Sequence, residues 1–171
     1  LVVKDGPLTH ELDRTIDEWA VRLPLRTIRL EQQSGLGTAL ATGVAQCTHD
    51  LVARMDADDR CHPERFQRQV RYMRELRSLA ALGSYAREFD AESGQIVGVR
   101  GVPLGPEDVR RSAWWRNPIN HMTVIFRKRE VERAGSYRHV PGFEDYDLWL
   151  RMLQNGAQLR NMAEVLVDAR V

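Results

Sequence analysis

Residues 51–59 read Leu51-Val-Ala-Arg-Met-Asp-Ala-Asp-Asp59, a short apolar run that ends in three carboxylates within four residues. The apolar part predicts a buried strand that ends at Asp56, Asp58 and Asp59. In open α/β sheets, ligand groups lie at the carboxyl edge of the strands. Three neighbouring carboxylates repel one another unless a cation joins them, and hard oxygen ligands favour Mg²⁺ or Mn²⁺ over zinc. We therefore expect a divalent-metal site with open positions for phosphate oxygens.

The acid cluster need not bind a metal, because Asp-rich turns commonly serve only as turns and helix caps. An EF-hand is excluded, since its sixth position would be Cys61 where glycine is required and its twelfth Gln67 where glutamate is required. The aspartyl nucleophile of a haloacid-dehalogenase-like phosphatase would be followed four residues later by threonine or valine. Arg60 stands there instead, which weakens the phosphatase alternative without eliminating it.

A helix is predicted after the acid cluster, over residues 63–78, because proline suits the first helical turn. Apolar residues recur along it at steps of four and three and predict its inward face: Phe66, Val70, Met73 and Leu76. Arginines spaced by three drift around the helix, so we expect them in solvent: Arg65, Arg68, Arg71, Arg74 and Arg77.

Helices and strands alternate along the rest of the chain and give way once to an antiparallel hairpin. The small residues at 35–45 favour close packing of a helix over ligand binding, because Gly-x-Gly without the full dinucleotide spacing is a weak signal. We expect helices over 9–20, 35–45, 106–115 and 128–133, strands over 25–30, 79–89, 95–99 and 122–126, and an extended segment over 159–167.

A second acid site opens the segment Gly142–Leu153, where Glu144 and Asp145 fall in the first turn of a predicted helix. Acids at a helix amino end are commonly only partners of the helix dipole. Leu148, Met152 and Tyr146 are expected on the buried side of this helix.

The composition indicates one soluble domain able to bury a substantial core, since 43% of the 171 residues are hydrophobic. The net charge of +1 gives no reason to expect nucleic acid as a partner. No run of about 18 apolar residues predicts a membrane span. Cys47 and Cys61 have no metal-ligand spacing and fit a reducing cytoplasm. Oligomeric state is not predicted.

Five segments together resemble the family two nucleotide-sugar glycosyltransferases of the GT-A fold, particularly bacterial enzymes of exopolysaccharide and surface-glycan synthesis. They read V-V-K-D-G (2–6), G-L-G-T-A-L-A-T-G (35–43), A-R-M-D-A-D-D (53–59), N-P-I-N-H-M-T (117–123) and G-F-E-D-Y-D-L-W-L-R-M (142–152). The resemblance implies an α/β fold with a mostly parallel, Rossmann-like sheet flanked by helices and a small antiparallel insert.

The resemblance also implies one domain over residues 1–171, with a donor-binding part over about 1–60 and an acceptor and catalytic part over about 61–171. Relatives have an earlier strand and helix, so we expect an amino-terminally truncated domain whose neighbouring strand edges are exposed.

The first acid cluster is similar to the D-x-D element that holds the metal and the donor in this family. By that likeness Asp58 and Asp59 bind the metal, and Asp56 and Asp58 bind the donor. Asp5 resembles a family acid near the donor base, although Lys4 stands where relatives often carry another aspartate.

The later acid pair is similar to the family's catalytic base, which points to Asp145 with Glu144 beside it. His121 either faces the site or makes a structural hydrogen bond. Trp115 and Trp114 could stack on a sugar, but aromatic residues more often serve packing, and we expect at least one in the core.

The expected reaction is therefore an inverting, metal-assisted transfer from a nucleotide-diphosphate sugar, most simply a UDP-sugar, to a glycan or lipid-linked saccharide. The resemblance implies a cytoplasmic protein that associates peripherally with the inner face of the membrane. Two alternatives stay open. One is a metal-dependent nucleotidyl- or phosphotransferase, and the other is an inactive carbohydrate-binding remnant.

Overall fold

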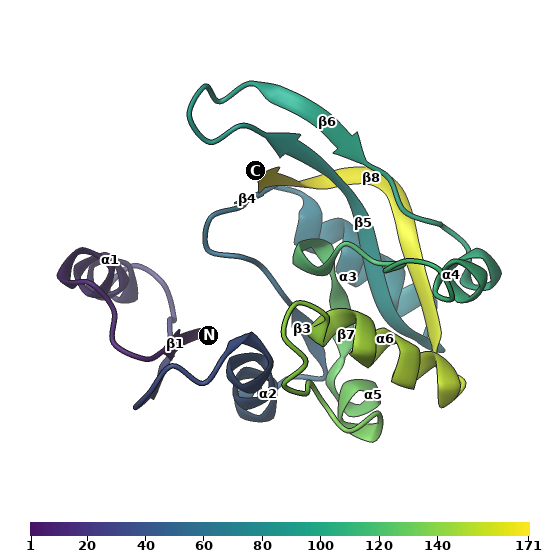
Figure 1. Cartoon of the computed structure of the whole chain (residues 1–171), viewed down its shortest axis with the longest axis horizontal. Helices are drawn as coiled ribbons and strands as arrows, with labels where there is room; N and C mark the ends of the chain where they lie inside the picture. The colour runs from purple at the N-terminus through teal and green to yellow at the C-terminus, as the bar shows by residue number, and fades with distance from the viewer.

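The computed structural model describes all 171 residues and arranges them as helices around a main β-sheet and a separate pair of strands (Figure 1). The strands are β1 (Val2–Asp5), β2 (Thr27–Leu30), β3 (Leu51–Ala53), β4 (Arg60–Cys61), β5 (Leu79–Phe89), β6 (Ile96–Arg100), β7 (Ile125–Arg127) and β8 (Gln158–Arg170). The helices are α1 (His10–Ala20), α2 (Leu36–Gln46), α3 (Arg65–Glu75), α4 (Pro106–Ser112), α5 (Lys128–Arg133) and α6 (Glu144–Gln154), with a 3-10 turn η1 (His121–Thr123).

The main sheet has the strand order β3-β7-β5-β8-β4, and β6 pairs with the outer half of β5 as a hairpin. Only β5 and β8 run parallel in this sheet, and the other pairings are antiparallel. The expected α/β architecture and antiparallel insert are confirmed, but the expectation of a mostly parallel sheet is wrong for these six strands. The strand β7 is the main reason, because it runs antiparallel to both of its neighbours, β3 and β5.

The strands β1 and β2 form a separate parallel pair, so no strand lies between β1 and β3. The strands β1 and β3 therefore each have one unpaired edge. The helix α2 packs against β1 closely enough that a Cβ at Gly43 would lie 3.0 Å from Val3. A Cβ at Gly37 would lie 2.1 Å from the Arg138 carbonyl oxygen, so close packing explains these glycines.

The core is divided between the two faces of the main sheet. Successive side chains of a strand point to opposite faces, and on β7 Phe126 joins the larger cluster while Ile125 joins the smaller one. The larger cluster packs α6, through Leu148 and Trp149, against the sheet with residues of α4 and α5. None of the helices is long and apolar enough to span a bilayer.

Truncating Leu148 to alanine is expected to lower the free energy of unfolding by about 2–5 kcal/mol, because the side chain is fully buried and leaves a cavity. The matched variant Leu12→Ala, on the exposed helix α1, is expected to change it by no more than about 0.5 kcal/mol. Urea unfolding checks both. Equal losses would contradict the placement of α6 in the core.

The helix α3 is shorter than predicted, and its buried face differs from the predicted stripe. Its buried residues are Arg65, Gln69 and Met73, whereas Phe66 is 48% and Leu76 37% exposed. Placing Arg65 in solvent was therefore wrong. The guanidinium is buried because backbone carbonyls from other segments accept its hydrogen bonds.

The segment predicted as a strand over 122–126 begins instead as η1, and β7 starts only at Ile125. The Thr123 hydroxyl explains the difference, since it donates to the Asn120 carbonyl at 2.8 Å and closes a turn. The remaining predicted elements are present with shifted ends. Among them, α6 contains the acids Glu144 and Asp145 in its first turn.

Candidate active site

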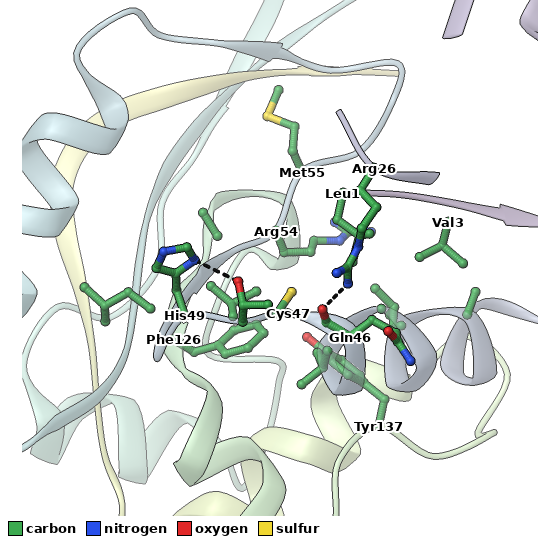
Figure 2. Close-up of a pocket in the computed structure, with 18 of the residues that line it drawn as sticks. Leu1, Val3, Arg26, Gln46, Cys47, His49, Arg54, Met55, Phe126 and Tyr137 are labelled. Carbon is green, nitrogen blue, oxygen red and sulfur yellow. Dashed lines mark hydrogen bonds between the residues drawn. The ribbon is translucent and has the colours of Figure 1, made fainter. Parts of the chain in front are cut away.

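A cavity of about 630 Å³ lies between β1, α2 and β3. Its walls are mainly apolar, with Val3, Leu40 and Val52 among the 13 hydrophobic residues of the 21 that line it. Figure 2 shows Arg54 and Arg26 extending toward the same space, with Tyr137 on the side of α2. A concave, largely apolar site with a few polar groups is typical of small-molecule binding.

One carboxylate of the first acid cluster, Asp56, lies at the wall of this cavity. Its two oxygens accept hydrogen bonds from the Arg54 guanidinium, one of them at 2.6 Å from Nη1. The strand β3 ends at Ala53, so these residues stand on the loop that leaves it. The Arg54 guanidinium therefore supplies part of the positive charge that the three neighbouring carboxylates require.

The other two carboxylates, Asp58 and Asp59, differ in environment. Asp58 is exposed. The Asp59 Oδ1 accepts a hydrogen bond from the Arg170 amide at 2.9 Å, but its Oδ2 is buried without a partner. Burial raises the pKa of Asp59, the Arg170 amide opposes this, and the charges of Asp56 and Asp58 add to the rise.

No group of three or more metal-ligating side chains is preassembled in the chain. Asp58 and Asp59 nevertheless fit a hard divalent cation. One oxygen of Asp59 lacks any partner, Asp58 lies within electrostatic reach of it, and both supply carboxylate oxygens. These two residues could hold Mg²⁺ or Mn²⁺ while leaving open positions.

The second acid site lies at the amino end of α6, where Asp145 has a fixed orientation. The Asn117 amide donates to its Oδ2 at 2.6 Å, and the Tyr146 backbone amide donates to its Oδ1 at 2.8 Å. Asp145 is half-buried, whereas Glu144 is 6% exposed and lies against Gly37 of α2. Asp145 is therefore the more accessible of the two acids.

His121 and Tyr137 form a hydrogen-bonded pair that packs against Trp149 and Phe126. The His121 Nε2 lies 3.0 Å from the Tyr137 hydroxyl. Of the two alternatives for His121, a place facing the site or a structural hydrogen bond, the structure contains the hydrogen bond. Burial raises the pKa of Tyr137, with the Arg54 charge opposing and the Asp145 charge reinforcing the rise. Tyr137 lines the cavity together with Arg54 and Asp56, whereas Asp58, Asp59, Glu144 and Asp145 are not among its lining residues.

Acidification is expected to destabilise the fold through His121. Burial, and secondarily the Arg54 charge, hold the pKa of His121 well below its usual value of 6.5. Below about pH 6.5, His121 therefore binds a proton in the unfolded chain but not in the folded chain. The free energy of unfolding then decreases as the pH is lowered, by at most about 1.4 kcal/mol per pH unit. Urea unfolding at pH 7.5, 6.5 and 5.5 should show a smaller acid loss in His121→Gln. The exposed control His10→Gln should match the parent; an unchanged acid loss in His121→Gln would refute the assignment.

Asp5 lies at the end of β1, and both of its oxygens accept backbone hydrogen bonds. The amides of Ser34 and Gly35 donate at 2.7 and 3.0 Å. Its carboxylate thus holds the turn that begins α2, and its contact with a donor stays a prediction. The neighbouring Lys4 pairs instead with Asp13 of α1 at 2.5 Å.

Trp114 and Trp115 follow α4, and the expectation that at least one lies in the core is wrong. They are 79% and 86% exposed, and neither lines the cavity. The chain reverses here, since the Trp115 amide donates to the Ser112 carbonyl at 3.0 Å. Buried Val109 and Ala113 provide the apolar face of α4, so the tryptophans project outward.

Sequence reasoning missed the polar residues that position the site. Arg65 donates to the carbonyls of Arg54 at 2.8 Å and Val124 at 3.3 Å, and to Gln69 at 3.0 Å. Gln69 in turn donates to the Thr123 carbonyl at 2.8 Å. These bonds join the loop of the first acid cluster to η1. The signal available in the sequence was the spacing of four residues between Arg65 and Gln69, which places both on one face of the helix.

Two further positioning residues, Asn117 and Tyr137, were also missed as such. Asn117 belongs to the segment that carried the family resemblance, but its partner Asp145 is distant in sequence. Nothing in the local sequence around Tyr137 indicates its burial.

Comparison with known proteins agrees with the resemblance. The family model for glycosyl transferase family 2 matches residues 1–134. The amylovoran biosynthesis glycosyltransferase AmsE of Erwinia amylovora is 42% identical over 170 residues, 99% of this chain and 63% of that protein. An Escherichia coli protein named UDP-Gal:alpha-D-GlcNAc-diphosphoundecaprenol beta-1,3-galactosyltransferase is 37% identical over 99% of this chain and 62% of its own length.

The chain thus spans less than two thirds of the length of these curated relatives. Among solved structures, TarS of S. aureus superposes with a TM-score of 0.75 at 18% identity, covering 99% of this chain and 50% of that one. The expected GT-A architecture is therefore confirmed at the level of the fold. The match of the family model over most of the chain, with relatives above 35% identity along nearly all of it, shows that the chain belongs to glycosyl transferase family 2.

Proposed function

We propose that the whole protein transfers a sugar from a nucleotide-diphosphate donor to a glycan or a lipid-linked saccharide, with inversion at the anomeric carbon. The observation that supports the proposal is the cavity that has Arg54, Asp56 and Tyr137 in its wall. The second acid, Asp145, is held in a fixed orientation at the amino end of α6 by the Asn117 amide. The E. coli relative, by its name, uses UDP-Gal and a diphosphoundecaprenol-linked acceptor. A UDP-sugar and a lipid-linked acceptor are accordingly the proposed substrates.

In this mechanism Asp145 is the general base. Its carboxylate takes the proton of the acceptor hydroxyl as that oxygen attacks the anomeric carbon, because a neutral hydroxyl is a poor nucleophile. The Asn117 amide fixes one carboxylate oxygen and so orients the base. Attack from the face opposite the leaving diphosphate gives inversion in a single displacement.

The first acid cluster acts on the donor. A divalent cation held by Asp58 and Asp59 would supply Lewis-acid stabilisation of the leaving diphosphate. Arg54 extends from the same loop toward the cavity and is a second positive group on that side. Asp56 restrains the guanidinium through its paired hydrogen bonds, and Arg65 fixes the backbone of the loop through the Arg54 carbonyl.

Product analysis tests the proposal. The full-length protein, incubated with Mn²⁺, a UDP-sugar and a polyprenyl-diphosphate saccharide, should release UDP and form a glycoside of inverted anomeric configuration by NMR. Release of pyrophosphate would instead identify a nucleotidyltransferase. Absence of metal-dependent nucleotide binding would identify an inactive remnant.

A further inference from the structure

The segment 110–116 forms the most exposed aromatic surface of the chain. Trp114 and Trp115 are 79% and 86% exposed, compared with 59% for Phe143, the next most exposed aromatic side chain. Two adjacent indoles held in water expose a large apolar area, and such surfaces mark sites of interaction.

Hydrogen bonds on both sides of the tryptophans attach this surface to the helix turn that contains Asp145. On one side of the tryptophans, the Tyr146 hydroxyl donates to the Ala113 carbonyl at 2.6 Å. On the other side, the Asn117 amide donates to Asp145 at 2.6 Å. Both anchors are in the first turn of α6, so the indoles protrude from a segment fixed to the same helix turn as the proposed base.

The charge around the tryptophans is unbalanced. Arg110, Arg111 and Arg116 are exposed, and none of them forms an ion pair. The acids of α4, Glu107 and Asp108, lie in its first turn at the other end of the helix. The Arg110 guanidinium donates to the Leu153 carbonyl at 3.5 Å and the Arg116 guanidinium to the Ser112 hydroxyl at 3.2 Å, so both are hydrogen-bonded but keep their positive charge. The surface therefore combines interfacial aromatic residues with guanidinium groups that have no acidic partner.

We propose that segment 110–116 docks on an anionic phospholipid bilayer, with the indoles at the headgroup boundary and the arginines on lipid phosphates. Tryptophan prefers this interface because its ring is apolar and its N–H polar. Basic residues are attracted to anionic lipid. The combination of interfacial aromatic residues with basic residues gives stable attachment. Docking here presents the amino end of α6 to the membrane. That consequence rests on the proposed function, since a lipid-linked saccharide is then delivered at Asp145.

A bilayer explains the surface better than stacking on a glycan does. Sugar-stacking rings usually line a concave site, whereas neither indole lines the cavity. A neutral saccharide also gives no role to the positive charge of three arginines that lack acidic partners. A fluorescence response of the tryptophans to soluble oligosaccharide but not to vesicles would overturn the proposal in favour of glycan binding.

Vesicle co-sedimentation tests the aromatic part. The full-length protein should bind vesicles of phosphatidylglycerol and phosphatidylethanolamine, and the double variant Trp114→Ala/Trp115→Ala should lower the partition coefficient about tenfold or more. The control Trp19→Ala removes a tryptophan that is 47% exposed on α1 and should leave binding unchanged. Equal binding by the double variant and the parent would overturn the proposal.

The charge part has its own matched control. Replacing Arg110, Arg111 and Arg116 by glutamine should weaken binding about fivefold for each arginine. The same replacement at the exposed arginines of α3 and the turn after it, Arg71, Arg74 and Arg77, should have little effect. Equal losses in both triple variants would show that vesicle binding depends only on the net charge of the protein, and would overturn the assigned surface. Vesicles of phosphatidylcholine alone should bind the parent weakly.

Failure of this inference can be told from failure of the proposed function. Vesicle binding is measured without substrate. Calorimetric titration of UDP with Mn²⁺ separately reports the donor site, which the tryptophan variants should retain. Normal UDP binding and transfer without vesicle binding would refute only the docking surface.

Discussion

Asp145→Asn is expected to lower kcat for sugar transfer by about 10²–10⁴-fold while UDP still binds with parental affinity. The asparagine keeps the shape of the side chain and can still accept from the Tyr146 amide, but it cannot take a proton from the acceptor hydroxyl. The general base acts in the chemical step, so the loss should fall on kcat rather than on donor binding. Rates of UDP release and calorimetric titration with UDP measure the two quantities.

A neighbouring carboxylate on the same helix provides the control. Asp147 lies in the first turn of α6 but pairs with Arg151 at 2.7 Å, so Asp147→Asn should retain most of the transfer rate. Turnover of Asp145→Asn near the parental rate would remove Asp145 from the role of base. An equal loss in Asp147→Asn would attribute the effect to the helix rather than to the base.

Replacing Asp58 and Asp59 together by asparagine is expected to weaken Mn²⁺-dependent UDP binding by about a hundredfold or more. The change removes both carboxylates that could hold the cation, and with them the charge that a hard metal ion requires. Asp59 contributes an oxygen that has no other partner in the fold, so the fold should tolerate its loss. Calorimetry with UDP, with and without Mn²⁺, measures the effect.

An acid elsewhere on the surface is the control for this variant. Asp90 accepts hydrogen bonds from Ser93 within the β5–β6 hairpin and has no part in the proposed donor site, so Asp90→Asn should bind UDP and Mn²⁺ normally. Retention of metal-dependent binding by the Asp58/Asp59 variant would show that the cation is held elsewhere.

The elements that the sequence predicted well have signals contained within a few residues. The β5–β6 hairpin has a turn at residues 90–94 between two strand patterns. The first turn of α6 combines a preceding glycine with Glu144 and Asp145. In both cases the local pattern and the tertiary structure agree, which is the condition for successful sequence reasoning.

The errors come from side chains whose partners are distant in sequence. Arg65 matches a solvent-exposed arginine by type, but it is buried because the carbonyls of Arg54 and Val124 accept its hydrogen bonds. The stripe predicted for α3 is therefore rotated. The tryptophans after α4 match core residues by type, but the core around α4 is already filled by Val109 and Ala113.

The candidate acids were chosen from motif spacing and the family resemblance, and their roles stay predictions. The family match covers the first acid cluster. The environment of these acids could not be predicted from the sequence. The Arg54 bridge to Asp56, the Asn117 contact with Asp145 and the buried Tyr137 each depend on how the chain is arranged in the fold.

The central claim is that carboxylates from distant parts of the chain serve one reaction centre, with Asp58 and Asp59 on the donor and Asp145 on the acceptor. A crystal structure of the full-length Asp145→Asn protein with UDP, Mn²⁺ and acceptor saccharide tests it most directly. We predict Mn²⁺ on Asp58 and Asp59 and the acceptor hydroxyl within about 2.6–3.2 Å of the residue 145 side chain. Mn²⁺ bound away from both aspartates, or an acceptor hydroxyl remote from residue 145, would contradict it.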